Sequence, residues 1–246
     1  MPSAPRPPAR RRGRGRPTRP VLSPELITDA AVQLVEDRGH DALTMAALAR
    51  ELGVAPSALY NHVETKQDVL RRVQDHVNRD VDCSAFGTLP WDEALAAWAR
   101  SYRDAYARHR PLVQVIAVTP VRGAPATVAM YERVAAGLRA GGWPAELVTD
   151  VVVAVESFVL GSALDTGAPA DIFDTGELAG SAPEFTAAVR ARPGGDTAAA
   201  AFELGLDALL AGLRARLARA AGPAAQEPPR DSPRGLPDPD ETSTTA

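Results

Sequence analysis

Apolar residues recur at the spacing of an α-helix along most of the chain, and no stretch shows the sustained alternation of a β-strand. Ser23, followed by Pro24 and an apolar stripe that ends at Gly39, has the pattern of a capped helix. The run 145–165 is apolar on nearly every side, so neighbouring helices must cover most of it. The apolar stripe of residues 198–219 is also too wide for one partner. We therefore predict an all-α fold.

Charge is distributed unevenly around a net value of −4. Residues 1–20 contain seven arginines and no acidic residue (+7), whereas residues 222–246 contain five acidic residues and two arginines (−3), which leaves −8 for residues 21–221. A basic arm on an acidic body is expected when only one end of a protein meets a polyanion. Residues 1–22 and the Pro-rich tail 222–246 contain too few large apolar residues for a core, so we expect both to be disordered.

The single cysteine, Cys83, excludes an internal disulfide framework and fits a reducing cytosol. The basic start is not followed by the apolar segment of a signal peptide. The most apolar run includes Asp150 and Glu156, which favours a buried helix over a membrane span. A cytoplasmic protein without a membrane partner is the expectation.

Residues 44–63 contain two short helical segments joined by a tight turn at Gly53, which is the helix-turn-helix pattern. Thr44 is placed to cap the first of them. Ala49 and Gly53 are small enough to let the two helices cross closely. Four apolar residues are spaced to hold the crossing from inside: Leu48, Leu52, Leu59 and Val63. The outer face of the second helix, predicted over residues 57–63, is then free to enter a major groove.

The side chains on that outer face are short and polar, and hydroxyls flank them at positions suited to phosphate oxygens. Lys66 begins the next helix, where its charge and the helix N-terminus both favour a phosphate. The residues predicted to contact DNA here are Thr44, Ser57, Ala58, Tyr60, Asn61, His62 and Lys66. A helical corner in a larger bundle, with Tyr60 against the core, is the alternative interpretation of the same pattern.

The arginine arm decides the electrostatics of this end of the chain. Residues 21–71 hold eight acidic and four basic residues, and the arm brings residues 1–71 to +3. We therefore expect most of the salt-dependent affinity for DNA to come from the arm. Within it, Arg14 and Arg16 flank Gly15 in an extended element able to enter an A·T-rich minor groove. Nonspecific contacts of a basic tail with phosphates are the alternative.

The segment LTMAALARELGVAPSALYNHVETKQDVL resembles the DNA-binding segment of the TetR (tetracycline-repressor) family of transcriptional regulators. WDEALAAWARSYRDAYARHRPL, YERVAAGLRAGG, VESFVLGSALD and AFELGLDALLAGL resemble the ligand-binding domain of the branch closest to the tetracycline repressors. The resemblance implies a DNA-binding head over residues 23–71 and a ligand-binding and dimerisation body over residues 72–221. It also implies an Ω-shaped homodimer, joined through the helices 145–165 and 198–219, that binds a palindromic operator.

The same resemblance implies which residues face the ligand pocket: Asp82, Trp98, Tyr102, Gln114, Tyr131 and Glu156. Glu156 lies within an apolar run, so its carboxylate must be paired, protonated or facing a cavity. It could meet a cationic or hydroxyl-rich ligand, or it could pair with an arginine of the last helix such as Arg214. The aromatic residues of 98–106 lie on one helical face and could equally be core.

Tetracycline-binding members place a metal-contacting histidine where this chain has Ile116, and Asp165 alone cannot support a magnesium site. We therefore expect no metal and no cofactor, and as ligand another small, partly apolar molecule.

The predicted function is a ligand-responsive transcriptional repressor, which binds its operator as a homodimer and is released from it by a small-molecule effector. A ligand-independent dimeric DNA-organising protein and an activator remain as alternatives. An enzyme is disfavoured because the chain lacks a Glu-x-x-His pair, a Walker lysine and a Gly-x-Ser-x-Gly elbow, and its four histidines lack ligand spacing. The segment 166–197 is expected to be a loop that either covers the pocket or is mobile.

Overall fold

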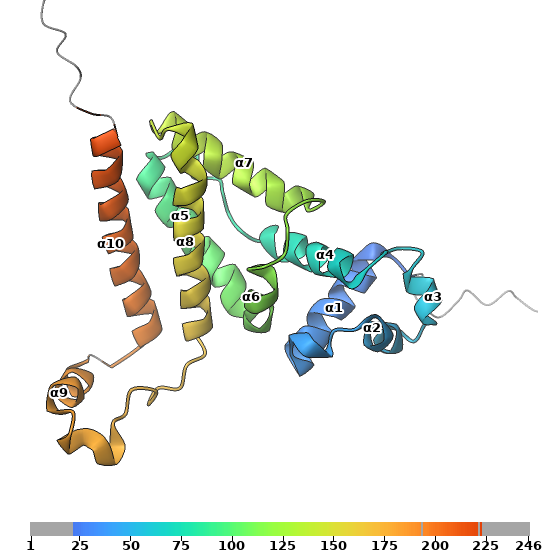
Figure 1. Ribbon diagram of the computed structural model, residues 1–246, viewed down its shortest axis with the longest axis horizontal. Helices are drawn as coiled ribbons and strands as arrows, with labels where there is room; N and C mark the ends of the chain where they lie inside the picture. The colour runs from blue at the N-terminus through green and yellow to red at the C-terminus, as the bar shows by residue number, and fades with distance from the viewer. Residues whose placement is uncertain (1–21, 193, 221, 223–246) are drawn as a thin grey trace, which may run out of the picture.

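The computed structural model describes residues 22–192, 194–220 and 222. Over these residues it contains ten α-helices, two short 3₁₀ helices and no β-strand, so the predicted all-α fold is confirmed (Figure 1). The elements in chain order are α1 (Pro24–Arg38), η1 (His40–Ala42), α2 (Met45–Leu52), α3 (Pro56–Leu59), α4 (Lys66–Asn78), α5 (Trp91–Arg108), α6 (Arg110–Ile116), α7 (Pro125–Ala140), α8 (Ala145–Asp165), η2 (Gly176–Gly180), α9 (Pro183–Ala191) and α10 (Thr197–Ala220).

Helices α1 to α3 form a small head at one end of the molecule, and α4 connects this head to the larger body (Figure 1). Local capping explains where the head helices begin. The Ser23 hydroxyl accepts a hydrogen bond from the Leu26 amide at 3.2 Å, and the Thr44 hydroxyl accepts one from the Ala47 amide at 3.0 Å. The sequence predicts both residues as N-caps, and the structure confirms them.

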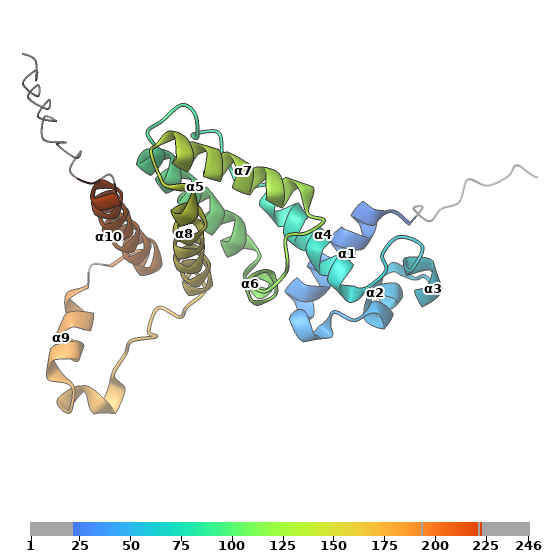
Figure 2. The ribbon, with the colours of Figure 1, turned by 45° about the horizontal axis from the view of Figure 1, so that its top comes forward.

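The body is built from α5 to α8 with α10 (Figure 2). Helices α5 and α8 pack along each other, with α7 on one side and α10 on the other. Two ion pairs fasten α10 to α5, Arg100–Glu203 at 2.7 Å and Arg214–Asp92 at 2.6 Å. The largest side chains of the body core are fully buried: Trp98, Tyr102, Tyr106, Trp143 and Phe202.

Helix α8 is long and apolar enough to cross a membrane by length and composition alone, but here it packs against α5, α6, α7 and α10. Part of its surface stays uncovered within one chain, since Val153 is 51% exposed and Leu164 is 43% exposed. On α10, Leu204 is 75% exposed. These exposed apolar side chains lie on two helices that contact each other.

Pro111 lies in the first turn of α6, where proline is tolerated because its missing N–H needs no partner. Two features differ from the sequence-based expectations. Helix α3 ends at Leu59 and not at residue 63. The segment expected as a loop, 166–197, contains η2 and α9, which stand away from the body (Figure 1).

Most residues of the predicted arm, 1–22, and of the predicted tail, 222–246, lie outside the described part of the chain. Leu22, predicted as the last residue of the arm, packs against the core of the head. Arg14, Arg16 and residues 223–246 are outside the described part of the chain.

Candidate nucleic-acid interface and ligand site

The turn between α2 and α3 has a geometry that requires glycine. Gly53 has φ 64° and ψ 33°, a left-handed conformation that β-carbon-bearing residues adopt at a cost. Its amide donates to the Arg50 carbonyl at 3.1 Å, and the Val54 amide donates to the Ala49 carbonyl at 2.9 Å, which is the Schellman pattern. Three residues, 53–55, separate α2 from α3, and the two helices pack directly against each other.

Helix α3 presents its outer face to solvent. Leu59 is fully buried between α2 and α3, whereas its neighbour Tyr60 is 53% exposed, so Tyr60 does not cap the core. Ser57 and Asn61 are exposed, and Ala58 is partly exposed. These four belong to the side chains that the sequence assigned to DNA contact, and the structure leaves each of them at least partly exposed.

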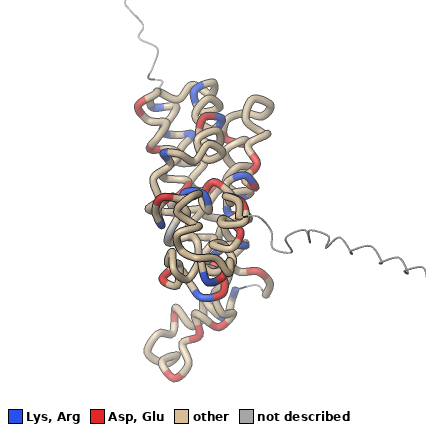
Figure 3. The backbone as a smooth tube through the Cα atoms, turned by 90° about the vertical axis from the view of Figure 1, so that its right-hand side faces the viewer, with Lys and Arg blue, Asp and Glu red and all other residues tan. Residues whose placement is uncertain are grey.

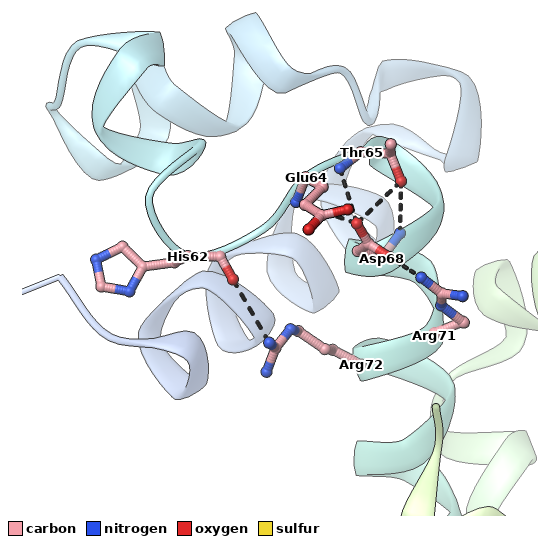
Figure 4. Close-up of polar contacts among 6 residues, drawn as sticks. All are labelled: His62, Glu64, Thr65, Asp68, Arg71 and Arg72. Carbon is pink, nitrogen blue, oxygen red and sulfur yellow. Dashed lines mark hydrogen bonds and ion pairs between the residues drawn. The ribbon is translucent and has the colours of Figure 1, made fainter. Parts of the chain in front are cut away.

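The second half of the helix that was predicted over residues 57–63 is a turn in the structure. The amides of His62 and Val63 both donate to the Leu59 carbonyl, at 2.9 and 3.0 Å, and no further helical turn follows. Tyr60, Asn61 and His62 have only modest helix propensity, which favours this early end. The His62 ring points away from α4 (Figure 4). The surface predicted to contact DNA therefore consists of a one-turn helix and of the turn that follows it, which carries the polar side chains.

The N-terminus of α4 is capped by a capping box formed by the Thr65 and Asp68 side chains (Figure 4). The Thr65 hydroxyl accepts from the Asp68 amide at 3.1 Å, and the Asp68 carboxylate accepts from the amides of Glu64 and Thr65 at 3.0 and 2.9 Å. Arg71 forms an ion pair with Asp68. Since a carboxylate already occupies this helix end, the partly exposed Lys66 side chain is the group there that remains suited to a phosphate.

Charge on the described head is mixed. Figure 3, which views the molecule from the head end, shows basic and acidic residues interspersed along the backbone. This agrees with the excess of acidic residues counted over residues 21–71, and it leaves the seven arginines of residues 1–20 as the main source of positive charge.

Inside the body, one carboxylate oxygen joins two tyrosines. The hydroxyls of Tyr102 and Tyr131 both donate to Oε1 of Glu156, at 2.6 and 2.5 Å. Burial, with the Glu156 charge nearby, raises the pKa of both phenols well above the usual value for tyrosine, so both remain protonated donors at neutral pH. Of the three states that the sequence leaves open for Glu156, the structure shows the paired one, with two phenols from α5 and α7.

The alternative partner, Arg214, binds elsewhere in this chain: its Nε lies 2.6 Å from Asp92. Trp98 lies next to the tyrosines, and its ring centroid is 5.2 Å from that of Tyr102. Its indole Nε1 is buried and has no hydrogen-bond partner among the described residues. A buried donor without a partner is costly, so an acceptor placed there would gain binding energy.

Two of the predicted pocket residues are not in this cluster. Asp82 is exposed in the loop after α4, where its carboxylate accepts from the amide and hydroxyl of Ser84 at 2.8 and 3.1 Å. Gln114 is exposed on α6 and lines a separate cavity of about 510 Å³ with Arg38, His40 and Arg110. Both positions were assigned by aligning the chain with the family that it resembles, and such an alignment does not determine the local path of a loop or a short helix.

A set of buried polar residues on α4 escaped the sequence-based prediction. Asp75 and Asn78 are buried, and both bind Thr127 of α7. The signal that could have indicated them is the interruption of the apolar stripe of α4, where polar residues take inward positions. Within the described residues, no group of three or more His, Cys, Asp and Glu side chains is placed to hold a metal ion.

A helix-turn-helix head on an all-helical body with a buried polar and aromatic cluster defines the class of ligand-sensing DNA-binding regulators. The comparison with protein families agrees with this class. Residues 27–73 match the model of bacterial regulatory proteins of the tetR family, and residues 86–217 match that of the tetracyclin repressor-like C-terminal domain. The chain belongs to the TetR family of transcriptional regulators.

Individual relatives support the same assignment. The HTH-type transcriptional repressor DrrR1 of Streptomyces coeruleorubidus is 32% identical over 155 residues, which cover 63% of this chain and 56% of DrrR1. The chain thus spans little more than half of that relative's length. The crystal structure of the Streptomyces coelicolor TetR family protein ActR with actinorhodin has a TM-score of 0.68 and 28% identity, covering 81% of this chain and 98% of ActR.

A protein named BioQ has been solved with its natural double-stranded DNA operator. That structure has a TM-score of 0.58 and 27% identity, covering 79% of this chain and 99% of BioQ. The two similar structures thus hold the two kinds of partner, a small molecule in ActR and DNA in BioQ.

Proposed function

We propose that this chain is a repressor that binds a palindromic operator as a homodimer and leaves it when a small molecule enters the body. The observation that carries the proposal is the course of α4, which begins in the DNA-binding head and ends beside the tyrosine network of the body. A single rigid helix that contacts both sites lets the occupancy of one bias the other. With its DNA target, the protein would act in the cytoplasm.

In this proposal some contacts of the head position it on the DNA backbone, and others recognise the base sequence. Thr44, Tyr60 and Lys66 would hold phosphates at the groove edges. The side chains that would reach base edges in the major groove are Ser57, Ala58, Asn61 and His62. Arg14 and Arg16 would follow the adjoining minor groove. Exposure of the residues on α3 and the following turn supports this division.

The ligand would bind at Glu156, Tyr102, Tyr131 and Trp98. The unpaired Trp98 indole N–H calls for a hydrogen-bond acceptor, and the Glu156 carboxylate calls for a donor. The surrounding aromatic rings favour a flat, partly apolar molecule with both kinds of group. Asp82 and Gln114 lie apart from this cluster and do not belong to the proposed site.

The dimer would form through α8 and α10, where Val153, Leu164 and Leu204 remain exposed in the single chain. An isologous interface there places the two heads about a two-fold axis, which a palindromic operator matches.

The test begins with selection of bound sequences from a random pool of DNA duplexes, followed by a footprint on the selected site. A short palindrome occupied by a dimer supports the proposal, and coverage that spreads without sequence preference favours a DNA-organising protein. Candidate small molecules, with actinorhodin among them, are then added to the complex. Release of the operator by a compound that no longer acts on a Tyr131→Phe variant supports the assigned site. Tighter operator binding with the bound compound contradicts the repressor mechanism.

A further inference from the structure

Three helices meet at one buried polar junction, formed by Asp75 and Asn78 of α4, Tyr106 of α5 and Thr127 of α7. Asn78 is 2% exposed and uses both ends of its amide: Nδ2 donates to the Thr127 hydroxyl at 3.0 Å, and Oδ1 accepts from the Tyr106 hydroxyl at 2.7 Å. Asp75, 4% exposed and one turn earlier on α4, accepts from the Thr127 amide at 3.0 Å. Thr127 therefore binds α4 twice, once through its side chain and once through its backbone.

These bonds fix the position of α4 along α7. Thr127 is the third residue of α7, at a helix end where backbone donors need partners from elsewhere and where a carboxylate is favoured. A shift of α4 along its axis would separate Asp75 and Asn78 from Thr127 and leave buried polar groups unpaired. Such groups are costly, so α4 either holds this position or moves to another in which the groups are again satisfied.

The junction is continuous with the proposed ligand site. Tyr106 and Tyr102 lie one turn apart on α5, and their rings make an edge contact with centroids 4.8 Å apart. The Tyr102 hydroxyl then donates to Glu156. A connected series of contacts thus runs from Glu156 on α8, through two rings of α5, to Asn78 on the helix that enters the DNA-binding head.

We infer that Tyr106, Asn78 and Thr127, together with Asp75, are the positioning residues that couple the ligand site to the head. A ligand that takes the Glu156 oxygen from Tyr102 displaces the neighbouring Tyr106 hydroxyl, and Asn78 then loses the hydrogen bond from Tyr106 that holds α4 in place. The inference rests on the proposed function, because it concerns how that ligand site acts on that head. Coupling is reciprocal, so operator binding must also alter the surroundings of the tyrosines when no ligand is present.

The chain has four tyrosines, which allows a direct test. Tyr60 lies on the proposed DNA surface, and Tyr102, Tyr106 and Tyr131 lie along the coupling path. Protein labelled with 3-fluorotyrosine is titrated with the selected operator duplex and followed by ¹⁹F NMR, with resonances assigned by single Tyr→Phe variants. We expect the operator to shift all four resonances of the wild type.

The informative variant is Thr127→Val, which keeps the side-chain shape and the backbone N–H but removes the hydroxyl that Asn78 binds. We expect it to keep the Tyr60 shift and to lose the operator-induced shifts of Tyr102 and Tyr131. Thr127→Ser retains the hydroxyl and is the matched control, which should respond as the wild type does. A purely structural role for Thr127 would lower stability and leave these operator-induced shifts in place.

Each failure has its own signature. If no duplex is selected from the pool, the DNA-binding proposal itself fails; if a selected duplex leaves Tyr60 unshifted, Tyr60 is not part of the contact surface. If Tyr60 responds while the three body tyrosines of the wild type do not, the coupling path is wrong and the DNA-binding proposal stands. If the operator shifts Tyr102 and Tyr131 of the Thr127→Val variant as far as in the wild type, the junction does not couple the head to the ligand site. Should Thr127→Val fail to fold, Tyr106→Phe removes the other bond to Asn78 and is read by the same criterion at Tyr102 and Tyr131.

Discussion

The hydroxyls of Tyr131 and Tyr60 are predicted to have different roles, the first in stability and the second in DNA binding. Removing each hydroxyl in turn separates the two effects. Tyr131→Phe deletes the 2.5 Å bond to Glu156 and keeps the ring. A hydrogen bond to a charged group contributes about 1.5–3 kcal/mol, and because Tyr131 and Glu156 are both partly exposed, water can compensate in part, which places the loss at about 1.5 kcal/mol. For a chain of this size that corresponds to a fall of about 3–6 °C in Tm.

Tyr60→Phe is the matched control because it removes the same hydroxyl from an exposed ring. We expect its Tm to equal that of the wild type, and its operator Kd to rise about five-fold, which corresponds to about 1 kcal/mol for one lost contact with a phosphate.

Thermal unfolding followed by circular dichroism measures the first effect, and fluorescence anisotropy with labelled operator measures the second. A Tyr131→Phe protein as stable as the wild type would show that the phenol–carboxylate bond contributes nothing net. A Tyr60→Phe protein with lowered Tm would show that this ring is part of the core.

Three further outcomes follow from single residues. Gly53→Ala should lower the free energy of unfolding by about 1 kcal/mol because of its left-handed backbone, whereas Gly53→Asn should cost less; denaturant unfolding that ranks Asn with Ala would contradict this interpretation of the turn. Burial raises the pKa of the Cys83 thiol to about 11, so alkylation of the native protein at pH 8 should be far slower than in denaturant and should accelerate towards pH 11; equal rates would show an open site. Lys66→Ala should weaken binding to all duplexes alike, whereas Asn61→Ala should change which sequences are selected, and a uniform loss for both would remove Asn61 from base contact.

The elements that the sequence predicts well are those with local causes. Ser23 and Thr44 cap their helices through hydrogen bonds to amides three residues on, and Gly53 ends α2 by its own backbone conformation. These features need only neighbouring residues, so a sequence pattern contains them.

The candidate ligand site was predictable in part. An acid in an apolar helix had to be paired, protonated or facing a cavity, and Glu156 is paired with two phenols. Its choice of Tyr102 and Tyr131 over Arg214 depends on how α5, α7 and α8 are arranged in space, which no local pattern specifies.

The junction at Asn78 and Thr127 brings together residues 49 positions apart, so it could be found only in the assembled fold. Sequence alone marks such residues merely as polar positions in an apolar stripe.

Both phenols meet the same oxygen of Glu156, and its second oxygen takes no part in either bond. In the proposed ligand site, a compound would therefore be accepted in two ways. A compound that binds only the second oxygen would leave both tyrosine hydrogen bonds in place and trigger no response, whereas one that takes the first oxygen would displace a phenol and trigger the response. Under this proposal, molecules of nearly equal affinity would be antagonists or inducers, according to which oxygen of Glu156 they bind.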